Sequence, residues 1–242
     1  MKHNTRFVPT ITGPLHIGHL YMALVNANEA HRSGGKFVMR VDDTQRYWVH
    51  NIDQRLVDQY YDQYCENLSR FMTVDVFERQ SNMPTVRDII GEHEILRFIP
   101  KEMWIYPQYV EWIPCSEMGL YPCAPSLTME KVVWDFYDDV TWLIRGEDLI
   151  TEASLYSYFA DCIGIPQVKQ TYLPRLRTDM RGELGHTIIS KTYKTFMLSD
   201  QIDEFGVSGV LDYLTKSCLV DPTKGFYVEN IKHNPSVTGL KT

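Results

Sequence analysis

The sequence of 242 residues has no apolar stretch near the roughly 18 residues of a membrane span, and no apolar run at its start. It has only five cysteines, an odd number for a chain of this length, which argues against a disulfide framework and favours reduced thiols. It also has no internal repeat and no low-complexity stretch. These absences predict a soluble cytoplasmic globule, without membrane association.

An excess of basic residues is missing as well. Lysine and arginine together number 24, against 31 aspartates and glutamates, for a formal charge of −7. A protein that coats nucleic acid needs concentrated positive charge, so this balance argues against that class while leaving room for a local basic patch. Hydrophobic residues make up 44% and charged residues 23%, which is typical of a globular protein with a large core.

Strand and helix signals alternate in the first part of the chain. Residues 6–9 and 37–41 are short apolar runs typical of strands, and residues 17–31 and 52–71 carry apolar stripes at helical spacing. This order favours an α/β fold with a doubly wound parallel sheet. The pattern returns later in the chain, where strands are expected at 140–144 and 172–173 and helices at 152–163 and 207–218.

Between these two regions the pattern weakens. A helix is expected at 86–98, followed by an aromatic stretch and proline-punctuated loops, which we interpret as an insertion. We predict that residues 1–98 form the first half of the catalytic domain and residues 99–130 an insertion. Residues 131–200 are predicted to form the second half with a signature loop, and residues 201–242 a C-terminal helical segment with a tail.

The first strand–loop–helix junction, residues 12–19, reads TGPLHIGH. A glycine-containing turn before a helix N-terminus is a ready anion site, because unpaired N–H groups and the helix dipole face outward together. His16 and His19 are three residues apart and share a face of the first turn, where they can donate to a phosphate. Gly18 has no side chain, which would let a nucleotide approach the backbone. Taken alone, the pattern is more often explained by two incidental histidines at a helix start.

Four segments of the sequence, one of which includes residues 12–19, resemble motifs of a single family. Residues 6–19 (RFVPTITGPLHIGH) resemble the opening of the glutamyl-tRNA synthetase branch of class I aminoacyl-tRNA synthetases, RFxPSPTGxLHIGH. Residues 40–44 (RVDDT) are similar to its RIEDT motif, and residues 143–149 (LIRGEDL) to its VIRGEDH segment. Residues 189–192 (ISKT) stand where that family carries its KMSKS-type loop.

The resemblance implies ATP-dependent activation of an amino acid as an aminoacyl-adenylate, with Mg2+ accompanying the ATP phosphates. It implies that His16 and His19 stabilise the transition state at the α-phosphate and that Lys191 holds the departing pyrophosphate. The remaining ATP contacts that it implies are Gly13, Gly18, Glu147, Ile189 and Ser190.

The resemblance also implies glutamate as the amino acid. Arg6 and Arg145 match the two family arginines that meet the side-chain carboxylate, and Asp42 matches the acid that meets the α-ammonium. A buried carboxylate needs a cation with good hydrogen-bond geometry, which a guanidinium provides. The alternative for both arginines is structural pairing with acids such as Asp42.

Several positions depart from the family pattern. Asp42 replaces a glutamate and is one methylene shorter, Leu127 stands near the expected tyrosine, and Ile188 replaces the first lysine of the signature loop. Cys115 and Cys123 have seven residues between them and no nearby Cys-x-Cys or histidine, whereas a tetrahedral zinc site wants four N/S ligands. We therefore expect no zinc and no other protein-bound metal.

We expect the chain to lack a counterpart of the anticodon-binding domain of full-length glutamyl synthetases, and in this it resembles the truncated glutamyl-queuosine tRNA(Asp) synthetases. The leading hypothesis is activation of glutamate and its transfer to a tRNA or another acceptor without anticodon reading. The alternatives are a non-catalytic synthetase-like protein that binds nucleotide, amino acid or RNA, and a nucleotidylyltransferase, against which the RVDDT and LIRGEDL segments argue. Neither the acceptor nor the oligomeric state follows from the sequence.

Overall fold

A computed structural model describes residues 1–44, 53–85, 88–89, 127–174, 176–178, 196–217, 225–231 and 236–237. The chain divides into two compact units. The first unit combines residues 1–82, 141–150 and 169–242, and the second combines residues 83–140 and 151–168. Each unit is therefore assembled from segments that are distant in the sequence.

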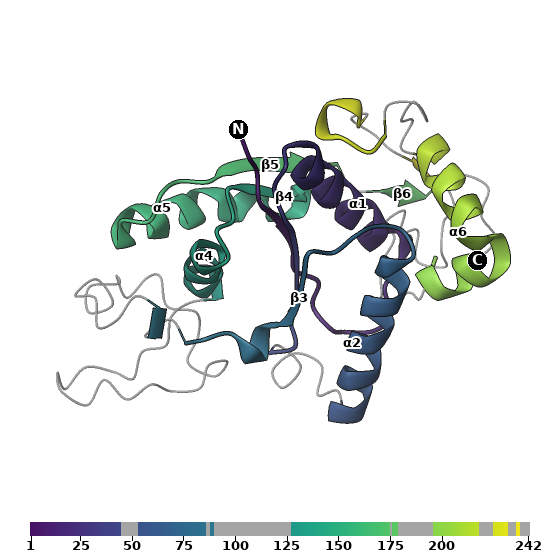
Figure 1. Cartoon of the computed structure of the whole chain (residues 1–242), viewed down its shortest axis with the longest axis horizontal. Coiled ribbons are helices and arrows are strands. Elements are labelled where there is room, and N and C mark those ends of the chain that lie inside the picture. Colours follow the sequence, from purple (N-terminus) through teal and green to yellow (C-terminus); the bar gives the residue numbers. More distant parts are fainter. Residues whose placement is uncertain are drawn as a thin grey trace. The chain divides into compact units, whose positions relative to one another are not determined.

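A parallel five-stranded sheet forms the centre of the first unit (Figure 1). Its strands pair in the order β3-β2-β1-β4-β5, so the order reverses between β1 and β4. This is the arrangement of Rossmann-like nucleotide-binding folds. The strands are β1 (Thr5–Phe7), β2 (Phe37–Val41), β3 (Val76–Arg79), β4 (Trp142–Gly146) and β5 (Lys169–Leu173).

The strand register divides the sheet into two faces of different character. Thr5 is aligned with both Phe37 and Trp142, and side chains alternate along each strand, so every second residue shares their face. Most side chains on that face are apolar and belong to the main hydrophobic core or pack against it: Phe7, Phe37, Met39, Val41, Phe77, Trp142, Ile144 and Leu173. Four polar residues share the face: Thr5, Arg79, Lys169 and Thr171. The opposite face carries polar side chains on all five strands: Arg6, Arg40, Glu78, Arg145, Gln170 and Tyr172.

Helix α1 (Ile17–Arg32) packs against β1, β2 and β4. Its buried positions are mostly apolar, as the amphipathic pattern predicts. Asn26, also buried, donates from Nδ2 to the Ile144 carbonyl at 3.1 Å, and its own carbonyl accepts from the Thr5 hydroxyl at 2.8 Å. The helix is thus fixed to the two strands between which the sheet order reverses.

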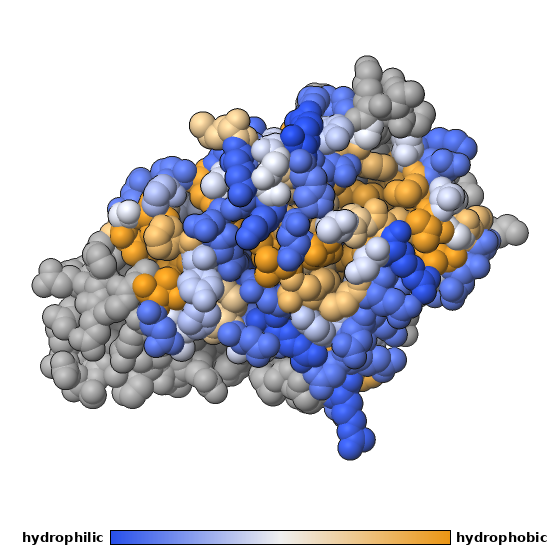
Figure 2. All heavy atoms as spheres, in the orientation of Figure 1, coloured by the Kyte–Doolittle hydropathy of each residue, from blue (hydrophilic) through white to orange (hydrophobic). Residues whose placement is uncertain are grey.

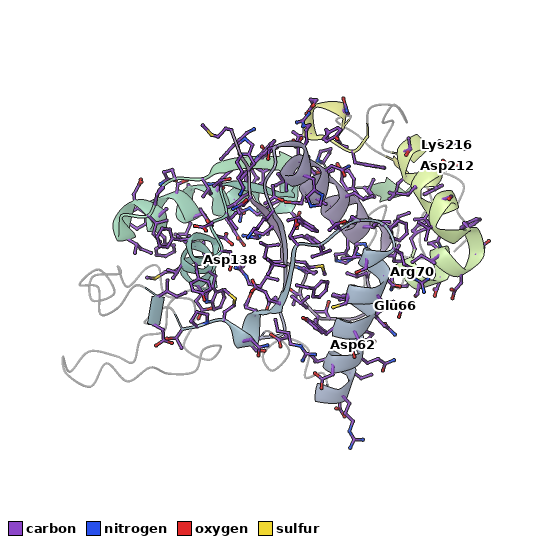
Figure 3. All side chains as sticks on the ribbon, in the orientation of Figure 1. Asp62, Glu66, Arg70, Asp138, Asp212 and Lys216 are labelled. Atoms are coloured by element: carbon purple, nitrogen blue, oxygen red, sulfur yellow. The ribbon has the colours of Figure 1, made fainter. Side chains whose placement is uncertain are left out.

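Helix α2 (Gln54–Ser69) begins at Asp53, whose side chain accepts from the Arg55 N–H. Figure 3 shows Asp62, Glu66 and Arg70 along this helix, and all three are exposed. The short 3-10 helix η2 (Gln80–Asn82) follows β3 directly.

The second unit contains α4 (Leu127–Tyr137) and α5 (Ala153–Ile163), which contact each other. The Tyr156 hydroxyl donates to Oδ2 of the fully buried Asp135 at 3.0 Å, which joins the two helices. The Trp134 indole donates to the Pro84 carbonyl at 2.9 Å.

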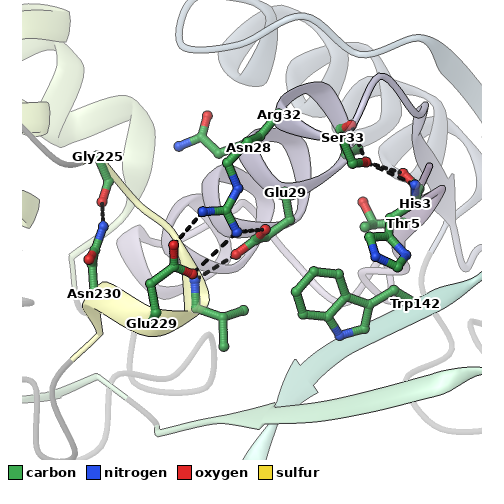
Figure 4. A network of polar contacts seen from close by, with 12 residues as sticks. His3, Thr5, Asn28, Glu29, Arg32, Ser33, Trp142, Gly225, Glu229 and Asn230 are labelled. Carbon is green, nitrogen blue, oxygen red and sulfur yellow. Dashed lines mark hydrogen bonds and ion pairs between the residues drawn. The ribbon is translucent and has the colours of Figure 1, made fainter. Parts of the chain in front are cut away.

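The C-terminal part begins with α6 (Leu198–Ser217), which is broken at Gly206, where φ is 66°. A short segment around η7 (Val228–Asn230) then lies along α1 (Figure 4). There Arg32 forms ion pairs with Glu29 and Glu229, and Glu29 accepts from the Val228 N–H at 2.9 Å. The strands β6 (Arg177–Thr178) and β7 (Ser236–Val237) form a separate parallel pair.

Several predicted elements differ from the observed ones. The strand β3 and the helix α4 were not predicted, and α4 crosses the expected boundary between residues 130 and 131. Strand β4 begins at Trp142 rather than at residue 140, because Val140 still closes the end of α4 by donating to the Asp135 carbonyl. The last helix begins at Leu198 instead of residue 207, since the break at Gly206 hides its first half from a periodicity reading. The expected 86–98 helix falls mostly outside the described residues.

Within the described residues, no helix is long and apolar enough to cross a membrane. On the face drawn in Figure 2, hydrophilic side chains are spread over the surface with apolar areas between them.

Candidate active site

The reversal of strand order between β1 and β4 places two loops at one edge of the sheet. The chain leaves β1, passes through residues 8–16 and enters α1, while β4 continues directly into the 3-10 helix η6 (Glu147–Glu152). In open parallel sheets, ligands bind beyond the carboxyl ends of the strands at such a reversal. The topology therefore brings the loop of His16 and the segment of Glu147 to the same edge.

The two histidines of this loop form the cap that starts α1. His16 is the N-cap residue, and its Nδ1 accepts from the Gly18 N–H at 3.1 Å. In return, Nδ1 of His19 accepts from the His16 N–H at 3.1 Å. The ring centroids lie 3.7 Å apart. Capping boxes usually combine a hydroxyl with a carboxamide or carboxylate, whereas two imidazoles fill both positions here.

This capping geometry sets the tautomer of both rings. Because each Nδ1 accepts a hydrogen bond, the proton of each neutral imidazole lies on Nε2. The site thereby has two imidazole N–H donors at the positive end of the dipole of a 16-residue helix. The first N–H groups of this helix, expected from the sequence to be unpaired, instead donate to the Phe196 carbonyl and to the His16 side chain and carbonyl. Donors fixed in this way suit an oxyanion whose charge grows during a reaction.

Gly18 leaves room for the cap. A Cβ built on Gly18 would lie 3.0 Å from both Cε1 and Nδ1 of the His16 ring, a tight contact that would require the ring to shift by a few tenths of an ångström. The absence of a side chain was predicted to admit a nucleotide, and the structure adds a second reason, which is that the His16 ring folds over this position. A larger residue at position 18 would disturb the cap directly.

Gly13 and Tyr64 fix the loop before the histidines. Gly13 is buried with a φ of 151°, and its carbonyl accepts a hydrogen bond from the Tyr64 hydroxyl of α2. Tyr64 is fully buried, and this burial raises the pKa of its phenol, which therefore stays protonated as the donor. Tyr64 was not among the predicted site residues, because its position in the apolar stripe of a helix gives no sign of this contact.

The segment that follows the predicted signature loop returns to the histidine loop. Ile17 N–H donates to the Phe196 carbonyl at 3.0 Å, and Leu198 N–H donates to the Leu15 carbonyl at 2.8 Å. Phe196 has a φ of 56°, which is unusual for an aromatic residue. These bonds hold residues 196–198 beside His16. Three predicted site residues, Ile189, Ser190 and Lys191, lie outside the described residues, as does Ile188.

The polar face of the sheet holds the two predicted specificity arginines. Arg6 on β1 and Arg145 on the neighbouring β4 are 5% and 4% exposed, and Arg40 on β2, on the other side of β1, is fully buried. Arg145 donates to the Gln170 side-chain oxygen at 3.0 Å and to the Tyr172 hydroxyl at 2.8 Å, both on the neighbouring β5. Buried guanidinium groups are costly unless they are paired, and Arg6, Arg40 and Arg145 all have partners within the protein.

Asp42 lies directly after β2 and is 1% exposed. Its Oδ1 accepts from the Thr44 N–H at 3.1 Å, from the Thr44 hydroxyl at 2.8 Å and from the Gln80 amide at 3.2 Å. Its Oδ2 accepts from the Thr10 hydroxyl at 3.3 Å. Much of the acceptor capacity of this carboxylate is thus used within the protein.

The residues Gln80, Gln170 and Tyr172 were missed from the sequence. Gln170 and Tyr172 follow from the register, which aligns Tyr172 with Arg145, but that register is not readable in one sequence. The phenol expected near Leu127 is absent there, while Tyr172 provides one beside Arg145. Gln80 follows a strand that was itself not predicted.

Metal ligands are not grouped in the described part of the chain. No set of three or more histidine, cysteine, aspartate or glutamate side chains there could hold a metal ion. The two cysteines considered for zinc, Cys115 and Cys123, lie outside the described residues. Cys65 and Cys162 are free thiols.

Comparisons with known proteins agree with this architecture. Residues 2–83 match the family described as tRNA synthetases class I (E and Q), catalytic domain. A Glutamyl-Q tRNA(Asp) synthetase from Methylococcus capsulatus is 54% identical, with 73% of each chain covered. A Glutamate–tRNA ligase 2 from Methylorubrum populi is 39% identical over 36% of this chain, which spans only 18% of that protein.

Solved structures share the fold. The glutamate-tRNA synthetase of Elizabethkingia anophelis superposes with a TM-score of 0.55 and 17% identity, covering 85% of this chain and 54% of that one. Tyrosyl-tRNA synthetase from Archaeoglobus fulgidus gives a TM-score of 0.54 at 13% identity, covering 81% and 61%. Since the family model matches the histidine segment and one relative is matched over most of its length, the chain belongs to the class I aminoacyl-tRNA synthetases, in the family of the glutamate and glutamine enzymes.

Proposed function

We propose that the protein activates glutamate with ATP and transfers it to a tRNA or tRNA-like acceptor. In the first step a glutamate α-carboxylate oxygen attacks the α-phosphorus of ATP, the bond to the bridging oxygen breaks, and pyrophosphate leaves. Such a reaction depends on positioning and charge stabilisation more than on acid–base catalysis. The observation that carries the proposal is the pair of histidines whose Nδ1 atoms cap α1 and whose Nε2 atoms remain the proton carriers.

His16 and His19 would donate to the α-phosphate as its charge grows, and Lys191 would hold the leaving pyrophosphate. The hydrogen bonds between residues 15–17 and 196–198 support this arrangement, because they anchor the end of the loop that carries Lys191 beside the histidines. Gly13, Gly18, Glu147, Ile189 and Ser190 would border the nucleotide. Magnesium, when bound, would arrive with the ATP phosphates and neutralise part of their charge.

Glutamate would bind on the polar face of the sheet. Arg6 and Arg145 are buried and share that face, which suits a side-chain carboxylate. Asp42 would meet the α-ammonium. The acceptor is an RNA whose reacting nucleotide enters this edge, and a cytoplasmic location fits these substrates.

The variant His19→Asn separates the capping role of His19 from its proposed catalytic role. In His19→Asn the amide oxygen can still accept from the His16 N–H, but the Nε2 donor is lost. We expect ATP–pyrophosphate exchange to fall about 100-fold or more, with thermal unfolding little changed. Exchange within a few-fold of the unmodified protein would contradict the role of His19.

A second candidate function is non-catalytic binding of nucleotide, amino acid or RNA. It is favoured by Ile188, which stands where the signature loop normally begins with lysine and so removes one cation from the pyrophosphate position. Exchange by the unmodified protein decides between the two. Binding of ATP and glutamate without exchange of pyrophosphate would favour the second.

A further inference from the structure

Behind Asp42 lies a cluster of buried polar groups that no role in the reaction yet explains. Gln80, the first residue of η2, is 1% exposed, and its Nε2 lies 3.2 Å from Asp42 Oδ1 and 2.9 Å from the Thr44 hydroxyl oxygen. A buried amide aimed at a buried carboxylate forms a charge-assisted hydrogen bond, which is stronger than a neutral one. We call Thr10, Asp42, Thr44 and Gln80 the Asp42 cluster.

The cluster sets the rotation of the carboxylate. Oδ1 accepts three hydrogen bonds, two from Thr44 and one from Gln80, so it is turned into the protein. Oδ2 then lies on the other side and accepts from Thr10 at 3.3 Å, in the segment between β1 and the histidines. We therefore expect a ligand of Asp42 to meet Oδ2 rather than Oδ1.

Gln80 is itself held in place. The next residue, Ser81, donates its N–H to Asp43 Oδ1 at 2.8 Å and its hydroxyl to Asp43 Oδ2 at 2.6 Å. The neighbouring carboxylates Asp42 and Asp43 thus contact neighbouring residues of η2. Asp43 thus uses both of its oxygens to hold η2 through Ser81, and this fixes the backbone of the adjacent Gln80.

We propose that Gln80 is a positioning residue for amino-acid binding, which orients Asp42 so that Oδ2 receives the α-ammonium of the substrate. This inference rests on the proposed function. An aspartate is one methylene shorter than glutamate, so its oxygens reach less far and their orientation matters more. The charged groups that share this face of the sheet are Arg6, Arg40, Glu78 and Arg145.

The test uses Gln80→Leu and Gln80→Glu in the full chain, with KM for glutamate and for ATP measured by pyrophosphate exchange. Gln80→Leu removes the donor, and we expect KM for glutamate to rise about tenfold while KM for ATP stays within about twofold. A general loss of folding would instead lower the exchange rate at saturating substrate and leave both KM values unchanged.

In Gln80→Glu, we expect KM for glutamate to depend on pH. Two carboxyls within hydrogen-bond distance cannot both be ionised easily, so the introduced group is protonated at the acidic end and donates as the amide does. We expect KM for glutamate close to that of the unmodified protein near pH ~6, rising about tenfold toward pH ~8.5. The unmodified protein and Gln167→Glu should not show this rise. Gln167 is a matched control, because its exposed amide also faces a carboxylate, Asp161 Oδ1 at 2.6 Å, outside the cluster.

The outcomes separate this assignment from the proposed function. If the unmodified protein exchanges pyrophosphate with glutamate but neither Gln80 variant changes KM for glutamate selectively, the positioning role is wrong and the function stands. If the pH-dependent rise appears equally in Gln167→Glu, the role is also wrong. If the unmodified protein shows no exchange with any amino acid, both are overturned. Should Gln80→Leu fail to fold, the pH series of Gln80→Glu alone decides.

Discussion

The two faces of the sheet are built from the same strands and differ in nearly every physical respect. On the face of Phe37, Met39 and Trp142 the side chains are apolar and pack with α1 in the main core. On the other face, Arg6, Arg40 and Arg145 are almost completely buried. Burial of apolar area stabilises the fold, whereas burial of a guanidinium costs free energy that its partners only offset. The comparison supports our proposal that one face mainly stabilises the fold and the other binds the amino acid.

The largest effect on recognition is expected from Arg145→Leu. A buried carboxylate that loses its guanidinium should lose about 3–5 kcal/mol of binding, so KM for glutamate should rise more than a hundredfold. ATP binding should survive. Arg145→Lys keeps the charge but not the bidentate fork, so its KM for glutamate should lie between those of the unmodified protein and Arg145→Leu. Exchange kinetics with titrated glutamate and separate calorimetry of ATP binding would measure this, and an unchanged KM for glutamate would remove Arg145 from the site.

A substitution on the apolar face should lower stability and leave glutamate binding unchanged. Met39 is fully buried there, and Met39→Ala should lower the free energy of unfolding by about 2–5 kcal/mol through lost transfer energy and the cavity left behind. Exchange activity per folded molecule should change little. Denaturant unfolding compared with exchange at low temperature checks both parts. A selective rise in KM for glutamate would mean that the two faces are not separate in function.

The smallest effect is expected on the side of α1, where the C-terminal segment is attached. The hydrogen bond from Arg32 lowers the pKa of Glu229. A carboxyl with a lowered folded pKa contributes stability above its ordinary pKa of about 4.3, and this contribution is lost as pH falls through the folded value. Glu229→Gln should therefore lower thermal stability slightly at neutral pH, by less than about 1 kcal/mol because the pair is exposed. The difference from the unmodified protein should disappear in acid, and a difference that grows in acid would contradict the assignment.

The sequence predicted the elements whose periodicity is strong. Strand β2 was predicted at 37–41 and helix α1 at 17–31, close to the observed ranges, because apolar side chains dominate the first and recur at helical spacing in the second. Strand β3 (Val76–Arg79) was missed because it is only half-buried and has two apolar residues followed by two charged ones. Such a strand carries little apolar signal of its own.

The candidate site was predicted only where a motif lies in one continuous segment. His16 and His19 are read directly from residues 12–19, whereas Gln80 and Tyr172 reach Asp42 and Arg145 through strand pairing. Pairing register is a long-range property, and one sequence does not contain it. Motifs therefore identified the groups that would contact substrate, and the structure was needed for the groups that orient them.

The most direct test of the account is ATP–pyrophosphate exchange by the unmodified protein, measured with each standard amino acid in turn and without added RNA. A polar sheet face with Arg6 and Arg145, together with a histidine-capped helix that begins at the carboxyl edge of the same sheet, predicts exchange that depends on glutamate. Each other amino acid should give a rate lower by about 100-fold or more, because none places a carboxylate correctly against both guanidinium groups. Exchange that prefers a neutral or basic amino acid, or no exchange with any of them, would contradict the account.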